Sequence, residues 1–176
     1  MDQLKILISR EQIAAKVAEI GARITADFAG QSVILIGVLR GAAIFLADLA
    51  REIHLDVSFD FIAVSSYGNR TQSGELKLIK DVDESLEGRN VILVEDILDT
   101  GVTLTYIKTL LEARRPKAFK IAALLDKTAR RKVPIEADYV GFKIPDQFVV
   151  GYGLDLAQRY RNLPHVCTIE EPNDRE

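Results

Sequence analysis

The sequence predicts an α/β fold: an open, mostly parallel twisted sheet flanked by helices. Continuous apolar runs rich in β-branched residues, such as Val33–Val38 and residues 91–95, are typical of strands that are covered on both faces. These runs alternate with segments in which apolar residues recur at spacings of three and four, as in amphipathic helices. Such alternation indicates parallel strands joined by right-handed helical crossovers. The length of 176 residues is typical of a single domain.

The first half of the chain is expected to hold two helices and two strands. Ser9 can cap the first helix and Gly30 follows its end, since hydroxyl side chains favour helix starts and glycine favours helix ends. The polar, glycine-containing segment 66–75 is expected to form an exposed loop or hairpin tip. In order, the elements are a helix over about 11–28, the strand Val33–Val38, a turn at residues 39–41, a helix over 42–53 and a strand over 59–65.

The second half continues the alternation and ends in short strands. Leu104, Ile107 and Leu111 recur at helical spacing, and Pro116 ends their helix. Ligands of open α/β sheets bind outside the carboxyl ends of the strands, so the residues that follow each strand are the first candidates for a site. In order, the elements are a strand over 91–95, a helix over about 103–114, a strand over 119–125, and short strands near 139–142 and 148–150 that complete the sheet.

Composition narrows the class of protein. The formal net charge of −3 does not favour a nucleic-acid binder, which would usually carry a basic stripe. Cys167 is the only cysteine, which excludes an internal disulfide and a multi-cysteine zinc site. No apolar run approaches the roughly 20 residues of a membrane span and no signal peptide is evident, so we expect a cytoplasmic protein. The basic runs 114–115 and 130–132 are expected to be solvated charges or part of a subunit contact.

The run VILVEDILDTGVT carries the chemistry. Its apolar strand brings Glu95 and Asp96 to the carboxyl edge of the sheet, and the segment from Asp99 to Thr103 then turns into a helix. Backbone N–H groups, threonine hydroxyls and the positive helix end suit a phosphate, and Gly101 allows a close approach. Carboxylates suit sugar hydroxyls or a hard cation, so a phosphorylated ribose with Mg²⁺ satisfies both demands. Neither GxxxxGK[ST] nor GxGxxG occurs.

This run resembles the phosphoribosyl pyrophosphate (PRPP) motif of type I phosphoribosyltransferases. Within this family, the run is similar to that of the 6-oxopurine (hypoxanthine-guanine) phosphoribosyltransferases, which carry Asp at the position of Asp99. This resemblance extends over about residues 33–170. It implies a purine salvage enzyme that transfers the 5-phosphoribosyl group from PRPP to hypoxanthine, guanine or both, giving IMP or GMP and pyrophosphate. It also implies a core of about 30–145 and a small base-binding hood, formed by the N-terminal segment and about 146–176.

The resemblance implies how the purine base is recognised. Lys127 offers only donors, which suits the carbonyl at the purine six-position and rejects the amino group of adenine. Phe148 would stack on the ring, and Val149 would present backbone groups to the base edge. Asp99 would be the general base that takes the proton from the five-membered ring. The implied PRPP ribose and phosphate contacts are Glu95, Asp96, Asp99, Thr100, Gly101, Val102 and Thr103.

The resemblance also implies a pyrophosphate site, a metal and a lid. In the family's first loop, which Leu39, Arg40 and Gly41 resemble, a peptide bond is often cis. Mg²⁺ is the implied cofactor, and the family assembles as homodimers or homotetramers. The implied pyrophosphate contacts are Leu39, Arg40, Gly41 and Arg161; the implied metal ligands are Glu95, Asp96 and Asp155; and the implied lid carries Ser66 and Tyr67.

Two alternatives remain open at this point. One is a phosphoribosyltransferase that prefers xanthine or a pyrimidine, because the contacts that separate hypoxanthine, guanine and xanthine are mainly backbone. The other is a regulator that binds PRPP without turnover. Asp99 and the Ser66-Tyr67 pair argue against the regulator, as does the lack of an appended nucleic-acid-binding domain in the sequence.

Overall fold

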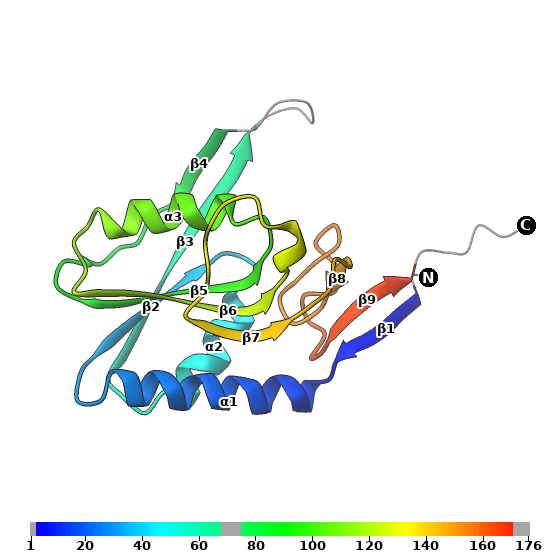
Figure 1. Ribbon diagram of the computed structural model, residues 1–176, viewed down its shortest axis with the longest axis horizontal. Coiled ribbons are helices and arrows are strands. Elements are labelled where there is room, and N and C mark those ends of the chain that lie inside the picture. The colour runs from blue at the N-terminus through cyan, green and yellow to red at the C-terminus, as the bar shows by residue number, and fades with distance from the viewer. Residues whose placement is uncertain (1–2, 68–74, 171–176) are drawn as a thin grey trace, which may run out of the picture.

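The computed structural model describes residues 3–67 and 75–170, which form two sheets and three α-helices (Figure 1). The six-stranded sheet has the order β4-β3-β2-β5-β6-β7, and a three-stranded sheet has the order β1-β9-β8. The predicted α/β class is therefore confirmed. The helices are α1 (Arg10–Asp27), α2 (Ala43–Glu52) and α3 (Val102–Glu112), and the strands are β1 (Gln3–Ile8), β2 (Val33–Val38), β3 (Val57–Tyr67), β4 (Glu75–Lys80), β5 (Asn90–Leu98), β6 (Ala118–Asp126), β7 (Tyr139–Lys143), β8 (Val149–Val150) and β9 (Val166–Glu170).

Helices cover both faces of the large sheet, with α1 and α2 on one side and α3 on the other (Figure 1). Strand β2 lies in the middle, is buried along its whole length, and pairs in parallel with β3 and β5. Its alternate residues enter two separate cores, Val33 and Leu35 with α1 and α2, and Ile34 and Ile36 with α3. This two-sided burial explains why the strand reads as a continuous apolar run.

Helix α1 begins as the sequence predicts. The Ser9 side chain accepts a hydrogen bond from the Gln12 amide at 3.2 Å, and the Gln12 side chain accepts one from the Ser9 amide at 2.8 Å. This reciprocal capping box satisfies amides that the first helical turn leaves unpaired. Gly30 has a positive φ of 74° shortly after the helix ends, where a left-handed residue reverses the chain.

Two expectations about the strands are wrong. The strand predicted over 91–95 continues to Leu98, so Asp96 lies inside β5 and not beyond it. The strand near 148–150 does not complete the large sheet, because β8 pairs antiparallel with β9, Val149 opposite Thr168. The end of β5 was placed too early because its acidic residues are typical of a turn. In the structure the amides of Asp96 and Ile97 donate to the carboxylates of Glu95 and Asp96, and β5 still pairs with β6. Strands β1, β4 and β9 were not anticipated.

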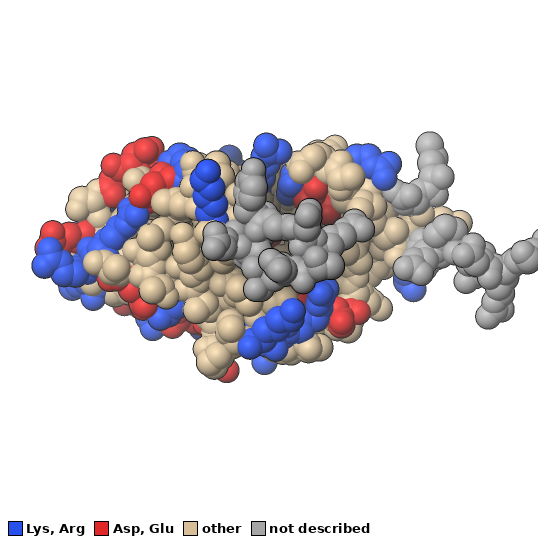
Figure 2. Space-filling model, turned by 90° about the horizontal axis from the view of Figure 1, so that it is seen from above, with Lys and Arg blue, Asp and Glu red and all other residues tan. Residues whose placement is uncertain are grey.

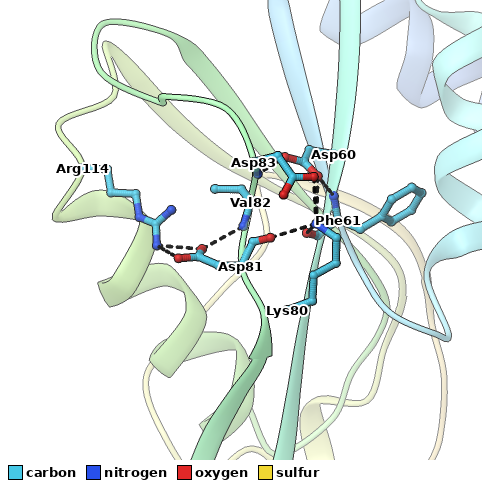
Figure 3. A network of polar contacts seen from close by, with 7 residues as sticks. All are labelled: Asp60, Phe61, Lys80, Asp81, Val82, Asp83 and Arg114. Carbon is cyan, nitrogen blue, oxygen red and sulfur yellow. Dashed lines mark hydrogen bonds and ion pairs between the residues drawn. The ribbon is translucent and has the colours of Figure 1, made fainter.

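A polar network ties β3, the segment after β4 and the end of α3 together (Figure 3). The buried Asp60 carboxylate accepts hydrogen bonds from the amides of Phe61 and Asp83 and from Lys80 Nζ. Burial opposes its ionisation, but these donors prevail and hold the pKa of Asp60 below its ordinary value. Arg114, expected to be a solvated charge or part of a subunit contact, donates twice to Asp81 at 2.7 Å. The network fixes the base of the β3–β4 pair against the rest of the sheet.

Charges of both signs intermingle on the face seen from above (Figure 2). The chain carries 23 Lys and Arg residues and 26 Asp and Glu residues, so neither sign dominates. Among the helices that the structure describes, none combines the length and the apolar character that crossing a membrane requires.

Candidate active site

Two neighbouring carboxylates lie at the carboxyl end of β5. Glu95 and Asp96 are only 8 % and 9 % exposed. Burial, and next the charge of Asp96, raises the pKa of Glu95 well above its ordinary value. Burial also raises the pKa of Asp96; a hydrogen bond with Glu95, backbone amides and, last, the positive charge of Arg161 offset part of this rise. Ionising both carboxyl groups is therefore costly in the free protein, and a bound cation would offset that cost.

The turn that follows β5 borders a cavity of about 210 Å³. Gly101 has a φ of 83°, and a Cβ at this position would lie 2.5 Å from the side chain of Ile135, so only glycine fits. Helix α3 begins at Val102, and its positive end faces the turn. Except for Val102, the residues expected to contact PRPP in this segment line the cavity: Glu95, Asp96, Asp99, Thr100, Gly101 and Thr103.

The Asp99 carboxylate lies in this cavity with unused hydrogen-bonding capacity. Its Oδ1 atom is buried and accepts no hydrogen bond from the described residues, although Arg130 Nε lies 3.5 Å away. A buried carboxylate oxygen without a donor is unusual in a folded protein. Asp99 can therefore accept a proton or a hydrogen bond from a ligand.

The loop between β2 and α2 packs directly against the acidic pair. The Leu39–Arg40 peptide bond is cis, as the resemblance implies. A Cβ at Gly41 would lie 1.7 Å from Asp96 Oδ2, and a Cβ at Gly153 would lie 2.0 Å from the Gly41 carbonyl oxygen. These two glycines allow three segments, far apart in sequence, to meet: the first loop, the end of β5 and the chain after β8.

A polar cluster joins the first loop to the chain after β8. The Oε1 atom of Gln158 accepts hydrogen bonds from Arg40 at 3.0 Å and from Arg161 at 3.2 Å. Arg161 also pairs with Asp155 Oδ1 at 2.8 Å and donates to the Gly153 carbonyl at 2.6 Å. The two arginines expected to hold pyrophosphate are thus brought together, and Asp155 lies beside them. Gln158, which links them, was not anticipated.

Lys127 follows β6 and is only 4 % exposed. Its amide donates to the Leu98 carbonyl at 2.9 Å, which places it beside the start of the turn. Its Nζ atom lies 3.9 Å from Asp146, which is also 3.9 Å from Arg130. Among the described residues its ammonium has a single carboxylate partner, at 3.9 Å, so it retains donors for another acceptor. Lys127 and the turn after β5 therefore lie at the same edge of the sheet.

The residues expected to form the base-binding hood differ in exposure. Phe148 is 55 % exposed, unusual for a large aromatic side chain, while Val149 is buried in β8. Asp146, two residues before Phe148, brings this segment to Lys127. Ser66 and Tyr67 end strand β3, but their side chains and residues 68–74 of the expected lid lie outside the described part. The roles of Phe148, Val149 and the lid remain predictions.

Arg131 is a functional candidate that the sequence did not reveal. It was expected to be a solvated charge or part of a subunit contact; solvation is wrong, because its side chain is 16 % exposed and forms an ion pair with Asp126. Its Nε also donates to the Asp99 carbonyl at 3.1 Å. Arg131 follows Asp126 by five positions across a short 3₁₀ turn, so no helical or strand spacing indicated this contact.

The carboxylates fit a magnesium ion that is shared with a substrate. Within residues 3–67 and 75–170, no group of three or more His, Cys, Asp or Glu side chains is arranged to hold a metal alone. Mg²⁺ usually binds through one or two carboxylates together with waters and substrate phosphates. The buried pair Glu95 and Asp96, beside a cavity suited to phosphate, matches that requirement.

Comparison with known proteins identifies the family. The phosphoribosyl transferase domain model matches residues 5–157. The hypoxanthine-guanine phosphoribosyltransferase of Bacillus subtilis is 53 % identical over 94 % of this chain and 93 % of its own length, and that of Streptococcus agalactiae is 49 % identical over 97 % and 95 %. A crystal structure of the Bacillus anthracis enzyme superposes with a TM-score of 0.92 at 49 % identity, covering 97 % of this chain and 100 % of that one. The chain therefore belongs to the phosphoribosyl transferase family and, within it, to the hypoxanthine-guanine phosphoribosyltransferases.

Proposed function

We propose that this protein transfers the 5-phosphoribosyl group of PRPP to hypoxanthine, guanine or both, giving IMP or GMP and pyrophosphate for purine salvage. The observation that carries the proposal is the meeting of four segments at one edge of the sheet. The turn after β5 adjoins Lys127 through the Leu98 carbonyl, Gly41 packs against Asp96, and Gly153 packs against the Gly41 carbonyl. A phosphate site, a cation site and a base-reading lysine are then within reach of one ligand.

PRPP is held by local groups, because the net charge of −3 gives this anion no general attraction. The amides and hydroxyls of Thr100 and Thr103, with the end of α3, take up the phosphate of the ribose. Arg40 and Arg161, linked by Gln158, take up pyrophosphate. Bidentate guanidinium contacts suit phosphate oxygens, and their charge stabilises the leaving group.

Lys127 selects the base. Its ammonium group can donate to the carbonyl oxygen at the six-position of hypoxanthine or guanine, whereas an amino group there offers no acceptor. Such a mismatch at a buried polar site lowers kcat/KM strongly, so adenine is rejected. The exposed ring of Phe148 covers the purine once it is bound, and Val149 supplies backbone groups to its edge.

Asp99 is the general base. Its Oδ1 atom, which accepts no hydrogen bond from the described residues, accepts the proton from the five-membered ring of the purine as that nitrogen attacks the anomeric carbon. The carbon–oxygen bond to pyrophosphate breaks in the same displacement, through an oxocarbenium-like transition state. Closure of a lid carrying Ser66 and Tyr67 would keep water from that centre.

Magnesium is the cofactor, held by Glu95, Asp96 and Asp155 together with the substrate. When bound, Mg²⁺ neutralises charge on the leaving pyrophosphate. Asp155 pairs with Arg161, so the same cluster orients the arginine and presents a carboxylate on the pyrophosphate side. A homodimer or homotetramer, with a cytoplasmic location, completes the proposal.

The proposal is tested with purified protein, hypoxanthine and PRPP while Mg²⁺ is varied. IMP and pyrophosphate should form in equal amounts, and the rate should rise steeply with Mg²⁺ and vanish with excess EDTA. PRPP binding without IMP formation at any Mg²⁺ concentration would point instead to a regulator that does not turn over.

A further inference from the structure

Three consecutive carbonyl groups, of residues 98–100 in the turn between β5 and α3, accept hydrogen bonds from the loop that follows β6. The Leu98 carbonyl accepts from the Lys127 amide at 2.9 Å, and the Thr100 carbonyl accepts from the Lys132 amide at 2.9 Å. The Asp99 carbonyl between them accepts from Arg131 Nε at 3.1 Å. Within the described residues this middle carbonyl has no other hydrogen bond, so a side chain alone holds it.

The orientation of this carbonyl decides where an amide points. In a trans peptide the C=O and the following N–H point in opposite directions. Because the Asp99 carbonyl faces Arg131, the Thr100 N–H faces away from Arg131. Thr100 lines the 210 Å³ cavity of the turn, and Arg131 does not. If the peptide turned over, a carbonyl oxygen would replace an N–H donor in a site meant for an anion.

The Arg131 guanidinium is itself firmly held. It forms an ion pair with Asp126 and donates to the Ile135 carbonyl, with a longer contact of 3.5 Å to the Leu98 carbonyl. Its Cδ atom would lie 3.1 Å from a Cβ at Gly101, so its stem packs against the turn. A planar guanidinium carries five donors in a fixed fork, and the ammonium group of a lysine cannot reproduce that arrangement of contacts.

We propose that Arg131 is a positioning residue that holds the Asp99–Thr100 peptide with its N–H directed at the phosphate of PRPP. The inference deepens the proposed function and rests on it. Arg131 acts through the backbone of the turn and not on the substrate. Its loss should therefore weaken PRPP binding specifically, and the site for the purine base should be much less affected.

The test compares Arg131→Lys and Arg131→Gln with Lys132→Met. Lys132 is the matched control, since its exposed side chain lies in the same loop and loses the same charge while its amide still holds Thr100. Both Arg131 variants should raise KM for PRPP about tenfold, the effect of losing one charge-assisted hydrogen bond. KM for the base should stay within about twofold of the parent. Thermal melting identifies any variant that fails to fold.

Two measurements separate the possible failures. Calorimetric titration of PRPP and Mg²⁺ into each folded variant measures PRPP affinity directly, whether or not the parent protein turns over a purine. A parent protein without turnover would contradict the proposed function but not the role of Arg131 in PRPP binding. If Arg131→Lys binds PRPP as Lys132→Met does, or if KM rises equally for PRPP and for the base, Arg131 does not position the turn.

Discussion

The amide of Lys127 donates a hydrogen bond of 2.9 Å to the carbonyl of Leu98. Leu98 is the last residue of β5 and precedes Asp99, and Lys127 follows the last residue of β6. The parallel pairing of these strands, Leu98 opposite Asp126, continues into this bond. The two motifs that the sequence separates by almost thirty positions are thus neighbours because adjacent parallel strands end at the same edge of the sheet.

Asp99→Asn should retain PRPP binding but lose most turnover. The amide is nearly the same size, yet it cannot take up the proton of the purine. A general base contributes roughly 10²–10⁴-fold, so kcat should fall within that range. Steady-state kinetics with saturating PRPP and Mg²⁺ measure kcat, and calorimetry measures PRPP affinity. An unchanged kcat would remove Asp99 from the mechanism.

Lys127→Gln should weaken the preference for 6-oxopurines. Loss of a buried charged donor should lower kcat/KM for hypoxanthine about 100-fold, which corresponds to roughly 3 kcal/mol. Glutamine also offers an acceptor, so discrimination against adenine should narrow. Lys108→Gln, on the exposed surface of α3, is the control. Equal losses on hypoxanthine and adenine would show that Lys127 does not read the six-position.

Glu95→Gln should make the metal-free protein more stable at neutral pH. Burial and the charge of Asp96 raise the pKa of Glu95, so the folded state binds this proton more tightly than the unfolded chain. Folding stability therefore falls as pH rises from the ordinary carboxyl pKa through the raised one, and glutamine removes that loss. In EDTA the variant should melt higher than the parent near pH 7, while below the ordinary carboxyl pKa the two should melt alike.

Exposed Glu136 provides the control for that comparison, because Glu136→Gln should leave the melting temperature unchanged. A lower melting temperature for Glu95→Gln at both pH values would indicate a packing defect and contradict the electrostatic account. Added Mg²⁺ and PRPP should stabilise the parent more than Glu95→Gln, since the carboxylate that repels Asp96 is also a proposed metal ligand.

Gly41→Ala should impair PRPP turnover more than it impairs folding. The added Cβ would lie 1.7 Å from Asp96 Oδ2, so either the carboxylate or the first loop must move. KM for PRPP should rise at least tenfold. Gly30→Ala is the comparison, because a Cβ there meets nothing within 4 Å; its positive φ should lower stability by about 1 kcal/mol without changing KM. Parent-like kinetics for Gly41→Ala would show that the close packing is not needed.

Much of the fold was predictable because its signals are local. The apolar run of β2, the Ser9 cap and the spacing of Leu104, Ile107 and Leu111 each reflect burial or hydrogen bonding within one element. The short strand β8 was assigned to the wrong sheet because two buried valines do not specify a partner. Its partner β9 begins at Val166, beyond a loop in which several residues have positive φ values. No local sequence pattern predicts the path of this loop.

The site was predictable where backbone geometry restricts the residue type. Gly101 and the acidic pair stand out because only glycine suits that φ, and because carboxylates at the end of a buried strand are unusual. Arg131 and Gln158 could not be found in this way. Their partners are backbone carbonyls or residues elsewhere in the chain, Asp126 and Arg40 among them, and such contacts leave no spacing in the sequence.

The most direct measurement is a panel of bases with PRPP and Mg²⁺, in which pyrophosphate release is followed for hypoxanthine, guanine, xanthine, adenine and uracil. The account holds that the turn that binds PRPP and the lysine that recognises the purine carbonyl lie at one edge of the sheet. Pyrophosphate should then be released with hypoxanthine, guanine or both at a rate that far exceeds the rate with adenine. Release with adenine or uracil, but with neither hypoxanthine nor guanine, would contradict the assignment of Lys127 and the proposed function.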